Sequence, residues 1–348
     1  MPGSVVSVFS EAEDFEVALR AEGALRLLVT GPGRFKARLT QVALHRLRLA
    51  AAEEQLPRIA LVAVPTDMIL VSLPRGRGPA PIWGGVRNGA GEIMTFGAGQ
   101  RVHMRTDAPC RWNSVWLPAT ELVQYYSAMT GAIFAVPTAA RWWQPGPAIG
   151  RHLRHLCSAA ISAVESRSKV LIDAEAARGL EQQLIDALVE CLSTGLAIEA
   201  PPATREHQHI AVSFEALLQA QPERALRMAE VCAALGVSPR ILRISCKEQL
   251  GMGPIEYARR QRMQLVHRAL RSGNADITSV SAIARRSGFR GLGRFAANYC
   301  ALFGELPSAT LRRGSAGGVP KLALGRPRIR LLMAALAWIN AGVMIATV

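Results

Sequence analysis

Two copies of one short pattern in the last third of the chain constrain its fold more than any other feature. Each copy has a short helical segment, a turn that contains glycine and a second helical segment. In the first copy, Gly236 follows residues 227–235, and Ser238-Pro239 begins the second helix as N-cap and first helical residue. In the second copy, a turn at 287–289 precedes a helix at 290–302. Two helices joined by about four residues are typical of a helix-turn-helix.

An arginine-rich helix at 255–271 connects the two copies, and Ser279, a good N-cap, begins the second copy after it. Seventeen residues with a rise of 1.5 Å each give this connector a length of roughly 25 Å. Neighbouring major grooves on one face of B-DNA lie about 34 Å apart. Allowing for the width of each unit, one chain can place two recognition helices in successive grooves.

Net charge is distributed unevenly along the chain. The 348 residues include 41 Lys+Arg and 26 Asp+Glu, for a formal charge of +15. Residues 1–204 contribute +2 (20 basic, 18 acidic), residues 205–314 contribute +9 (17 and 8) and residues 315–348 contribute +4 (4 and 0). The duplicated pattern therefore lies in the most basic segment, which predicts a polyanionic partner there and a different role for the first two thirds.

Residues 210–313 resemble the DNA-binding domain of the AraC/XylS family of transcriptional regulators. The matching patterns are Ser238-Pro239-Arg240-Ile241-Leu242, Gly251-x-Gly-Pro254-x-x-Tyr257, Arg262-Met263 and Ile283-Ala284-x-x-x-Gly288-Phe289. Most specific is the closing stretch Gly293-Arg294-Phe295-Ala296-x-Asn298-Tyr299-x-x-x-Phe303-Gly304-Glu305-x-Pro307-Ser308. The chain looks most similar to the XylS-like branch, whose members regulate aromatic catabolism.

This resemblance implies a sequence-specific transcriptional regulator, usually an activator. The implied partners are double-stranded operator DNA, RNA polymerase, a second copy of the chain and a small-molecule effector, for which an aromatic acid is suspected. Base contacts are implied for outward residues of the two recognition helices, because Arg suits guanine and Asn suits adenine: Arg240, Arg243, Arg290, Arg294 and Asn298. Phosphate contacts, or simple solvation, are expected for Arg259, Arg260, Arg285 and Arg286.

The first two thirds of the chain contain short apolar runs separated by Gly, Pro and Asp. Five runs are typical of strands: 58–64, 68–73, 92–96, 102–105 and 112–117. Their spacing predicts a β-sandwich or a small barrel, and helical patterns follow at 120–129, 147–165 and 171–192. A looser resemblance to the effector-binding domain of the same family implies a cupin-like β-barrel. The expected fold class is α+β, with a C-terminal all-α double helix-turn-helix domain.

Composition divides the chain into four expected parts. Residues 1–200 form the effector-binding and dimerisation domain, and leucines at helical spacing in 171–192 suit packing inside it or across a dimer. Residues 201–209 form a linker, and residues 210–314 form the DNA-binding domain. Residues 315–348 form a basic and then apolar extension, whose last 18 residues carry no charge. We favour an extension that is docked on the body or poorly ordered. A membrane anchor formed by this apolar segment, and hence a membrane-tethered regulator, is the alternative.

Motifs for catalysis and metal binding are missing from the sequence. It contains no P-loop, no Gly-x-Ser-x-Gly and no Gly-x-Gly-x-x-Gly that opens a helix. His103 has no partner at a metal-binding spacing, so neither a metal nor a cofactor is expected. A DNA-processing enzyme that uses the same kind of DNA-binding domain is the alternative. The chain lacks the reactive cysteine or cysteine cluster that such an enzyme needs. We therefore expect a regulator and not an enzyme.

The cysteines and the N-terminal residues predict a cytoplasmic protein. No two of the six Cys have a CxxC spacing, and they lie in apolar segments, as reduced cysteines do. The N-terminal segment has no basic region followed by an uninterrupted apolar run, so it is no signal peptide. Cys246 and Cys300 replace the Phe and the basic residue usual in the family, and packing is favoured over a redox role. Five of six Trp lie in the nearly neutral first two thirds, which is compatible with a small-molecule pocket.

Overall fold

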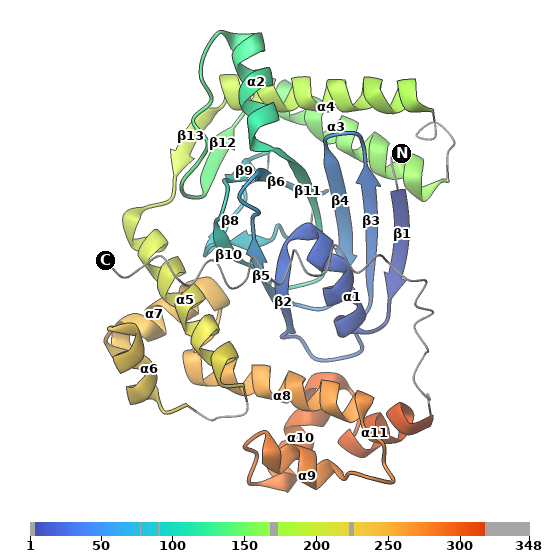
Figure 1. Ribbon diagram of the computed structural model, residues 1–348, viewed down its shortest axis with the longest axis vertical. Helices are drawn as coiled ribbons and strands as arrows, with labels where there is room; N and C mark the ends of the chain where they lie inside the picture. The colour runs from blue at the N-terminus through green and yellow to red at the C-terminus, as the bar shows by residue number, and fades with distance from the viewer. Residues whose placement is uncertain (1–3, 77, 90, 168–172, 223–225, 317–348) are drawn as a thin grey trace, which may run out of the picture.

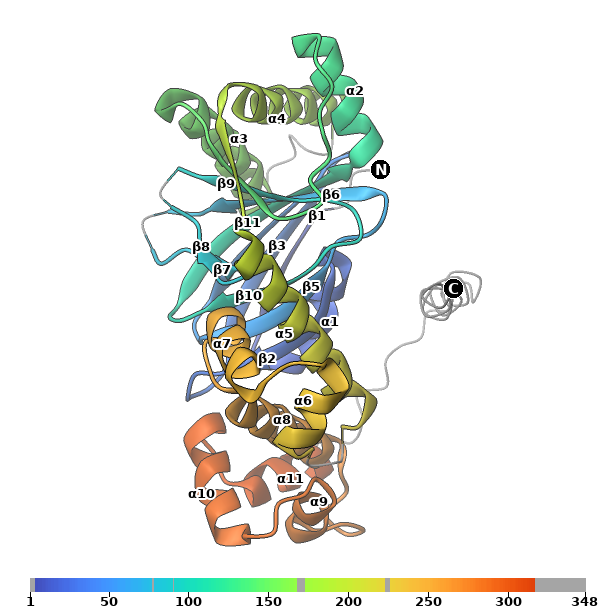
Figure 2. The ribbon, with the colours of Figure 1, turned by 90° about the vertical axis from the view of Figure 1, so that its left-hand side faces the viewer.

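The computed structural model describes residues 4–76, 78–89, 91–167, 173–222 and 226–316. Strands with their covering helices occupy one end of the molecule, and helices from the last third occupy the other (Figures 1 and 2). We call the end with the strands the first region and the end with the helices of the last third the second region. Helix α5 (Pro202–Ala220) runs from the first region into the second. Its first turns contain residues 202–209, which the sequence assigned to a linker.

Two antiparallel sheets pack face to face in the first region. The larger sheet has the order β1 (Ser4–Phe9), β3 (Ala37–Ala43), β4 (Arg48–Glu54), β11 (Cys110–Pro118), β6 (Met68–Pro74), β9 (Ile93–Phe96), β12 (Arg141–Gln144) and β13 (Leu196–Glu199). The smaller sheet has the order β2 (Ala24–Val29), β5 (Arg58–Ala63), β10 (Arg101–Thr106), β7 (Ile82–Trp83) and β8 (Val86–Arg87). Four α-helices and one short 3-10 helix accompany the sheets in the described residues: α1 (Ala12–Leu19), η1 (Arg20–Glu22), α2 (Ala119–Thr130), α3 (Pro147–Glu165) and α4 (Ala174–Thr194).

The alternation of side chains along the central strand β11 creates two apolar cores. Trp112 and Trp116 point into the space between the sheets, where they join one cluster of buried residues. Val115 and Leu117 point to the opposite face and join a second cluster, which α3 and α4 cover (Figure 2). The region therefore has three layers, namely the smaller sheet, the larger sheet and a helical layer.

The α+β class predicted from the sequence is confirmed, and each of the five predicted strand runs contains a strand, β5, β6, β9, β10 and β11. The structure differs from the predicted barrel in how the sheets end. Among the described strands, β1 and β13 lie at the two ends of the larger sheet, and β2 and β8 lie at the ends of the smaller one. The described strands therefore form two open antiparallel sheets rather than a closed barrel.

The leucine-rich stripe predicted at 171–192 belongs to the interior of the first region. Leu184, Leu188 and Leu192 of α4 are each 1% exposed. They pack in the apolar cluster between the helical layer and the larger sheet. Leu171, at the start of the predicted stripe, lies outside the described residues. Of the two kinds of packing that the sequence allowed, the structure has the one inside the domain.

The second region contains the two predicted helix-turn-helix units. The first consists of α6 (Met228–Leu235) and α7 (Pro239–Leu250), and the second of α9 (Val280–Arg286) and α10 (Leu292–Phe303). The predicted caps are present, since Ser238 Oγ accepts a hydrogen bond from Ile241 N and Ser279 Oγ accepts one from Ala282 N, both at 3.2 Å. We call the segment from α5 to the last helix, α11 (Pro307–Ala316), the reader.

Helix α8 (Pro254–Ser272) connects the two units, as the arginine-rich segment predicted. The apolar extension predicted as a docked segment or membrane anchor lies almost wholly outside the described residues, which end at residue 316. None of the helices in the described part of the chain combines the length and apolarity that a membrane crossing requires.

Replacing Leu188 by Ala tests whether the α4 stripe is core. We expect the free energy of unfolding to fall by about 2–5 kcal/mol, because the change leaves a cavity in a closely packed cluster. Gln183, which is exposed on the same helix, provides the control, and Gln183→Ala should change stability little. Urea unfolding at several protein concentrations measures both effects. If the loss of unfolding free energy in Leu188→Ala, but not in Gln183→Ala, grew as the protein was diluted, the stripe would lie in a dimer interface.

Candidate nucleic-acid interface

The exposed face of α7 is a stripe with helical spacing. Arg240 and Arg243 are exposed, as predicted, and so are Ile244 and Lys247, at positions that continue the same face. The opposite face holds Leu242, which is fully buried in the core of the first unit. Sequence reasoning missed Ile244 and Lys247, although their spacing from Arg240 would have identified them.

The second unit presents fewer long side chains. Arg294 is exposed near the start of α10, and the next exposed positions on this helix are the small residues Ala297 and Ala301. Arg290 is also exposed but lies in the turn before α10, because the helix begins at Leu292 and not at 290 as predicted. Arg294 is therefore the long polar side chain that the exposed face of α10 offers among the described residues.

Asn298 and Arg260 are partly buried where the reader meets the first region. They line a pocket of about 270 Å³ between α8, α10 and the segment after β2, together with Arg259, Thr30 and Pro32. Arg260 Nη1 donates a 2.6 Å hydrogen bond to the Thr30 carbonyl, and its Nε donates a 3.0 Å bond to Glu256. In this arrangement Arg260 already has partners within the protein.

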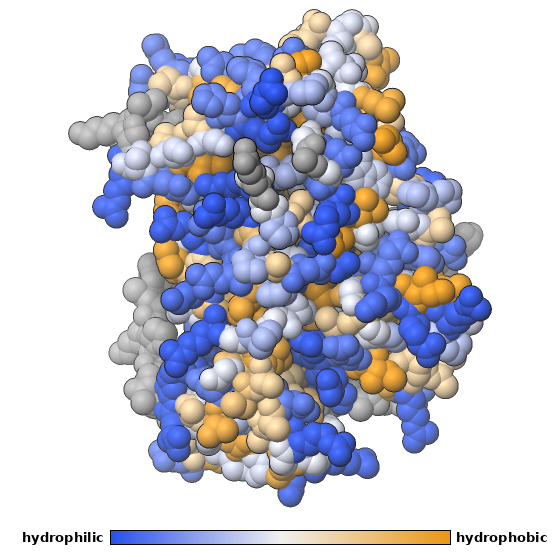
Figure 3. All heavy atoms as spheres, turned by 180° about the vertical axis from the view of Figure 1, so that it is seen from behind, coloured by the Kyte–Doolittle hydropathy of each residue, from blue (hydrophilic) through white to orange (hydrophobic). Residues whose placement is uncertain are grey.

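The remaining predicted phosphate contacts are exposed. Arg259 lies on α8, and Arg285 and Arg286 end α9. Helices α7 and α10 lie on the same side of the reader, toward the left of Figure 2. Seen from behind, in Figure 3, the reader end shows hydrophilic side chains interspersed with apolar ones. The structure thus brings the predicted arginines to one end of the molecule, on the two helix-turn-helix units and the connecting helix α8.

Hydrogen bonds from two elements of the reader fix it against the sheets. Gln249 Nε2, near the end of α7, donates to the Gly84 carbonyl in the turn between β7 and β8, at 3.0 Å. On α8, Gln264 Nε2 donates to the Leu27 carbonyl of β2 at 2.9 Å. The recognition helix of the first unit and the connector are therefore both docked on the first region.

A buried ion pair lies at the centre of this docking surface. His103 of β10 and Glu215 of α5 are 0% and 1% exposed, and His103 Nε2 lies 2.6 Å from Glu215 Oε2. Gln261 Nε2 and Arg26 Nε lie 3.3 and 3.7 Å from the other carboxylate oxygen. Burial would raise the pKa of Glu215, but the hydrogen bond and charge of His103 and the charge of Arg26 hold it below its ordinary value.

Four buried cysteines, Cys110, Cys157, Cys191 and Cys246, are poor nucleophiles. Cys246 is fully buried in the first unit, and burial raises the pKa of its thiol to about 12. Burial also raises the pKa of Cys157 and Cys191 to about 12 and that of Cys110 to about 11. These thiols stay protonated at neutral pH, which disfavours reactivity.

Comparisons with known proteins point to one family. A family model described as a helix-turn-helix domain matches residues 231–313. The probable thc operon regulatory protein of Rhodococcus erythropolis is 32% identical over 163 residues, which cover 44% of this chain and 48% of that protein. The XylDLEGF operon transcriptional activator 1 of Pseudomonas putida is 36% identical over 104 residues, or 29% of this chain and 31% of that one. The chain thus spans less than half the length of each of these relatives.

A solved structure is also similar in sequence to part of this chain. A probable AraC family transcriptional regulator from Rhodopseudomonas palustris is 34% identical to this chain, which covers 97% of that regulator, while the match covers 30% of this chain with a TM-score of 0.29. This chain belongs to the AraC/XylS family. The resemblance that the sequence motifs indicated is therefore confirmed, and the family is one of transcriptional regulators.

Replacing His103 by Ala tests the buried pair. We expect the free energy of unfolding to fall by about 3–5 kcal/mol, because the Glu215 carboxylate stays buried without its main partner. The pH dependence of the contribution that Glu215 makes to stability should also reverse. In the wild-type protein, the lowered pKa of Glu215 contributes stability that is lost as the pH falls through that pKa. In the variant, burial raises the pKa, so this contribution is lost as the pH rises.

Urea unfolding across the acid and neutral range measures both effects. The exposed His155 of α3 is the matched control, and His155→Ala should leave stability and its pH dependence nearly unchanged. A His103→Ala variant with wild-type pH dependence would show that the pair does not determine the ionisation of Glu215.

Proposed function

We propose that the protein is a DNA-binding transcriptional regulator that inserts α7 and α10 into successive major grooves. The observation that carries the proposal is the pair of recognition helices on one side of the reader, each with an exposed arginine near its start (Figure 2). Arginine pairs with guanine in the major groove through two hydrogen bonds. The charge of +9 on residues 205–314 supplies the general attraction to phosphates.

Base contacts are proposed for Arg240 and Arg243 in the first unit and for Arg290 and Arg294 in the second. The exposed Ile244, 40% accessible amid the basic stripe of α7, suits contact with a thymine methyl group. Phosphate contacts are proposed for Arg259, Arg285 and Arg286. Asn298 and Arg260, also predicted to contact DNA, would reach it only if the reader moved relative to the first region.

The first region is proposed to bind an effector, in the role of the family's cupin-like domain. Ser72 and Ser114 lie opposite each other on β6 and β11 and face the space between the sheets. Both are buried, and neither hydroxyl has a hydrogen-bond partner among the described residues. The indole N–H groups of Trp83 and Trp142, in the same core, also lack partners. Unpaired polar groups inside an aromatic core suit an aromatic acid, whose ring packs while its carboxylate accepts hydrogen bonds.

The other partners implied by the family stay part of the proposal. The assignment of residues 1–200 to effector binding and dimerisation, of 210–314 to DNA binding and of 315–348 to an extension is likewise proposed. Because the α4 stripe is buried, a homodimer needs another surface of the first region. Contact with RNA polymerase and cytoplasmic location follow from the proposed activator role. A membrane-tethered form would depend on residues 331–348, which lie outside the described residues.

Alanine variants of Arg240 and Arg294 separate base reading from phosphate binding. Each should cost about 1–3 kcal/mol of binding free energy and relax preference at one or two operator positions. The two relaxed positions should lie about one helical turn apart, because each unit occupies its own groove. Arg286→Ala should instead weaken binding to all sequences alike. It should also reduce the slope of log K against log salt concentration by about one, the value of one phosphate contact.

Binding of the full chain to a randomised operator library at two salt concentrations measures all three variants. Arg286 is the matched control because it is exposed and lies outside both recognition helices, unlike Arg260, which contacts Thr30. Uniform loss of affinity with unchanged sequence preference for Arg240→Ala and Arg294→Ala would identify these residues as phosphate contacts.

A second experiment tests the effector site. Ser72→Ala/Ser114→Ala should weaken binding of aromatic acids about tenfold, the value of roughly one hydrogen bond, while the unliganded protein keeps or gains stability. Tryptophan fluorescence titration with a panel of aromatic acids measures binding, and Ser158→Ala on the exposed face of α3 is the control. Equal affinity in all three proteins would place the effector elsewhere.

A further inference from the structure

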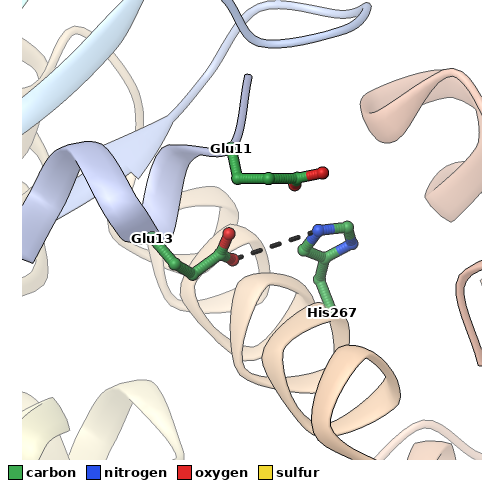
Figure 4. A group of neighbouring side chains, drawn as sticks. All are labelled: Glu11, Glu13 and His267. Carbon is green, nitrogen blue, oxygen red and sulfur yellow. Dashed lines mark ion pairs between the residues drawn. The ribbon is translucent and has the colours of Figure 1, made fainter. Parts of the chain in front are cut away.

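Three potential ligand side chains from the two regions meet beside the docking surface. Glu11 is the N-cap of α1 and Glu13 lies in its first turn, whereas His267 lies in α8 of the reader. One carboxylate oxygen from each Glu and one ring nitrogen of the His lie within 4.8 Å of one another. Figure 4 shows the two carboxylates and the imidazole converging on one small space between the helices.

A chain of hydrogen bonds orients the imidazole from behind. His267 Nδ1 lies 2.6 Å from Tyr299 Oη, Tyr299 donates to Thr310 Oγ1 at 2.8 Å, and Thr310 donates to Glu305 Oε1 at 2.6 Å. Glu305 also accepts two hydrogen bonds from Arg313, so it is a carboxylate that accepts and does not donate. The hydroxyls of Tyr299 and Thr310 each have one proton. Thr310 uses its proton to reach Glu305, and Tyr299 uses its proton to reach Thr310. Nδ1 must therefore donate to Tyr299, which leaves the lone pair of the neutral ring on Nε2.

The Nε2 atom faces Glu11 and Glu13 without a hydrogen bond. It lies 4.0 Å from Glu13 Oε1, which is too far for one. The residue is 6% exposed, and the ring stacks on Phe303 with centroids 4.2 Å apart, so it is held in place. A lone pair and carboxylate oxygens are all acceptors. The side chains of Glu11 and Glu13 are 28% and 17% exposed, so the convergence of these acceptors in a partly buried place is unfavourable unless cations offset it.

Acidic and basic side chains both surround the three residues. Glu11, Glu13, Asp14 and Glu16 bring four carboxylates to this end of α1. Arg271 contacts Glu13 at 2.8 Å and Glu11 at 3.6 Å, and Arg268 contacts Glu16. Arg20, whose side chain is 63% exposed, approaches Glu16 at 3.8 Å. Arg268 also approaches Glu13 at 3.9 Å, and the charge of Arg313 acts on Glu11, so the acids have several basic neighbours. In Figure 4, carboxylate oxygens of both Glu nevertheless point toward the imidazole.

We propose that Glu11, Glu13 and His267 form a binding site for a divalent transition-metal ion of the Zn²⁺ type. One imidazole and two carboxylates are a common set of ligands for such ions, and a water completes a tetrahedron. A His that donates its other ring N–H to a hydrogen-bonded partner is typical of metal sites. The ligand atoms have to approach one another to about 3.3 Å, as bond lengths near 2.0–2.1 Å require. The ion would join α1 to α8 and hold the reader against the sheets.

Titration of the full chain with Zn²⁺ alone, followed by isothermal calorimetry, tests the site. We expect one saturable Zn²⁺ per chain and no comparable heat from Mg²⁺, which does not favour imidazole. Glu11→Gln/Glu13→Gln should weaken Zn²⁺ binding at least tenfold, and His267→Gln should do the same. Asp14→Asn is the matched control, because Asp14 lies in the same turn, its side chain is 65% exposed and it is not a ligand. This variant should bind Zn²⁺ as the wild-type chain does.

A thermal unfolding series separates metal binding from a purely structural role. Zn²⁺ should raise the midpoint of the wild-type and Asp14→Asn proteins and leave that of Glu11→Gln/Glu13→Gln unchanged, whatever its starting value. Equal Zn²⁺ affinity in the wild type and the double variant would overturn the proposal, as would Mg²⁺ binding as tightly as Zn²⁺. No DNA is present, so a negative result leaves the proposed DNA-binding function intact, and loss of DNA binding leaves this titration interpretable.

Discussion

Helix α8 is the element on which both the reader and its docking depend. Its apolar side chains enter the cores of both helix-turn-helix units, with Tyr257 in the first and Val266 and Leu270 in the second. Its polar residues, spaced three or four apart, contact the first region: Arg260, Gln264, Arg268 and Arg271. One helix of 19 residues therefore sets the distance between the recognition helices and fixes their orientation to the sheets.

Features determined by neighbouring residues were predictable from the sequence, whereas long-range pairing was not. Ser238, Gly236 and Ser279 define helix ends through their own backbone preferences, and both caps are found where expected. The end of the larger sheet depends instead on Trp142 of β12 pairing with Ile198 of β13, far along the chain. No local pattern indicates that these short segments pair, so the sequence left open whether the sheets would close.

The same distinction applies to the candidate interface. The arginines of α7 follow helical spacing and were identified from it, and the same spacing extends to Ile244 and Lys247. The surroundings of Arg260 depend on Thr30, which is 230 residues away, and no sequence pattern links them. His267 was not considered beside Glu11 and Glu13 for the same reason, since the helices that contain them come together only through docking.

Docking also affects how the reader presents its positive charge. The first region is nearly neutral overall, but its acids at Glu11, Glu13 and Glu16 face Arg268 and Arg271. The docked reader therefore shows DNA less positive charge than its sequence contains. Salt screens these partly exposed pairs and phosphate contacts alike, but it screens the buried His103–Glu215 pair much less. Moderate salt should thus loosen the α8 end of the docking surface while α5 stays attached to β10. The salt-sensitive part of the docking surface therefore lies at α8, and the salt-resistant part lies at the buried pair between α5 and β10.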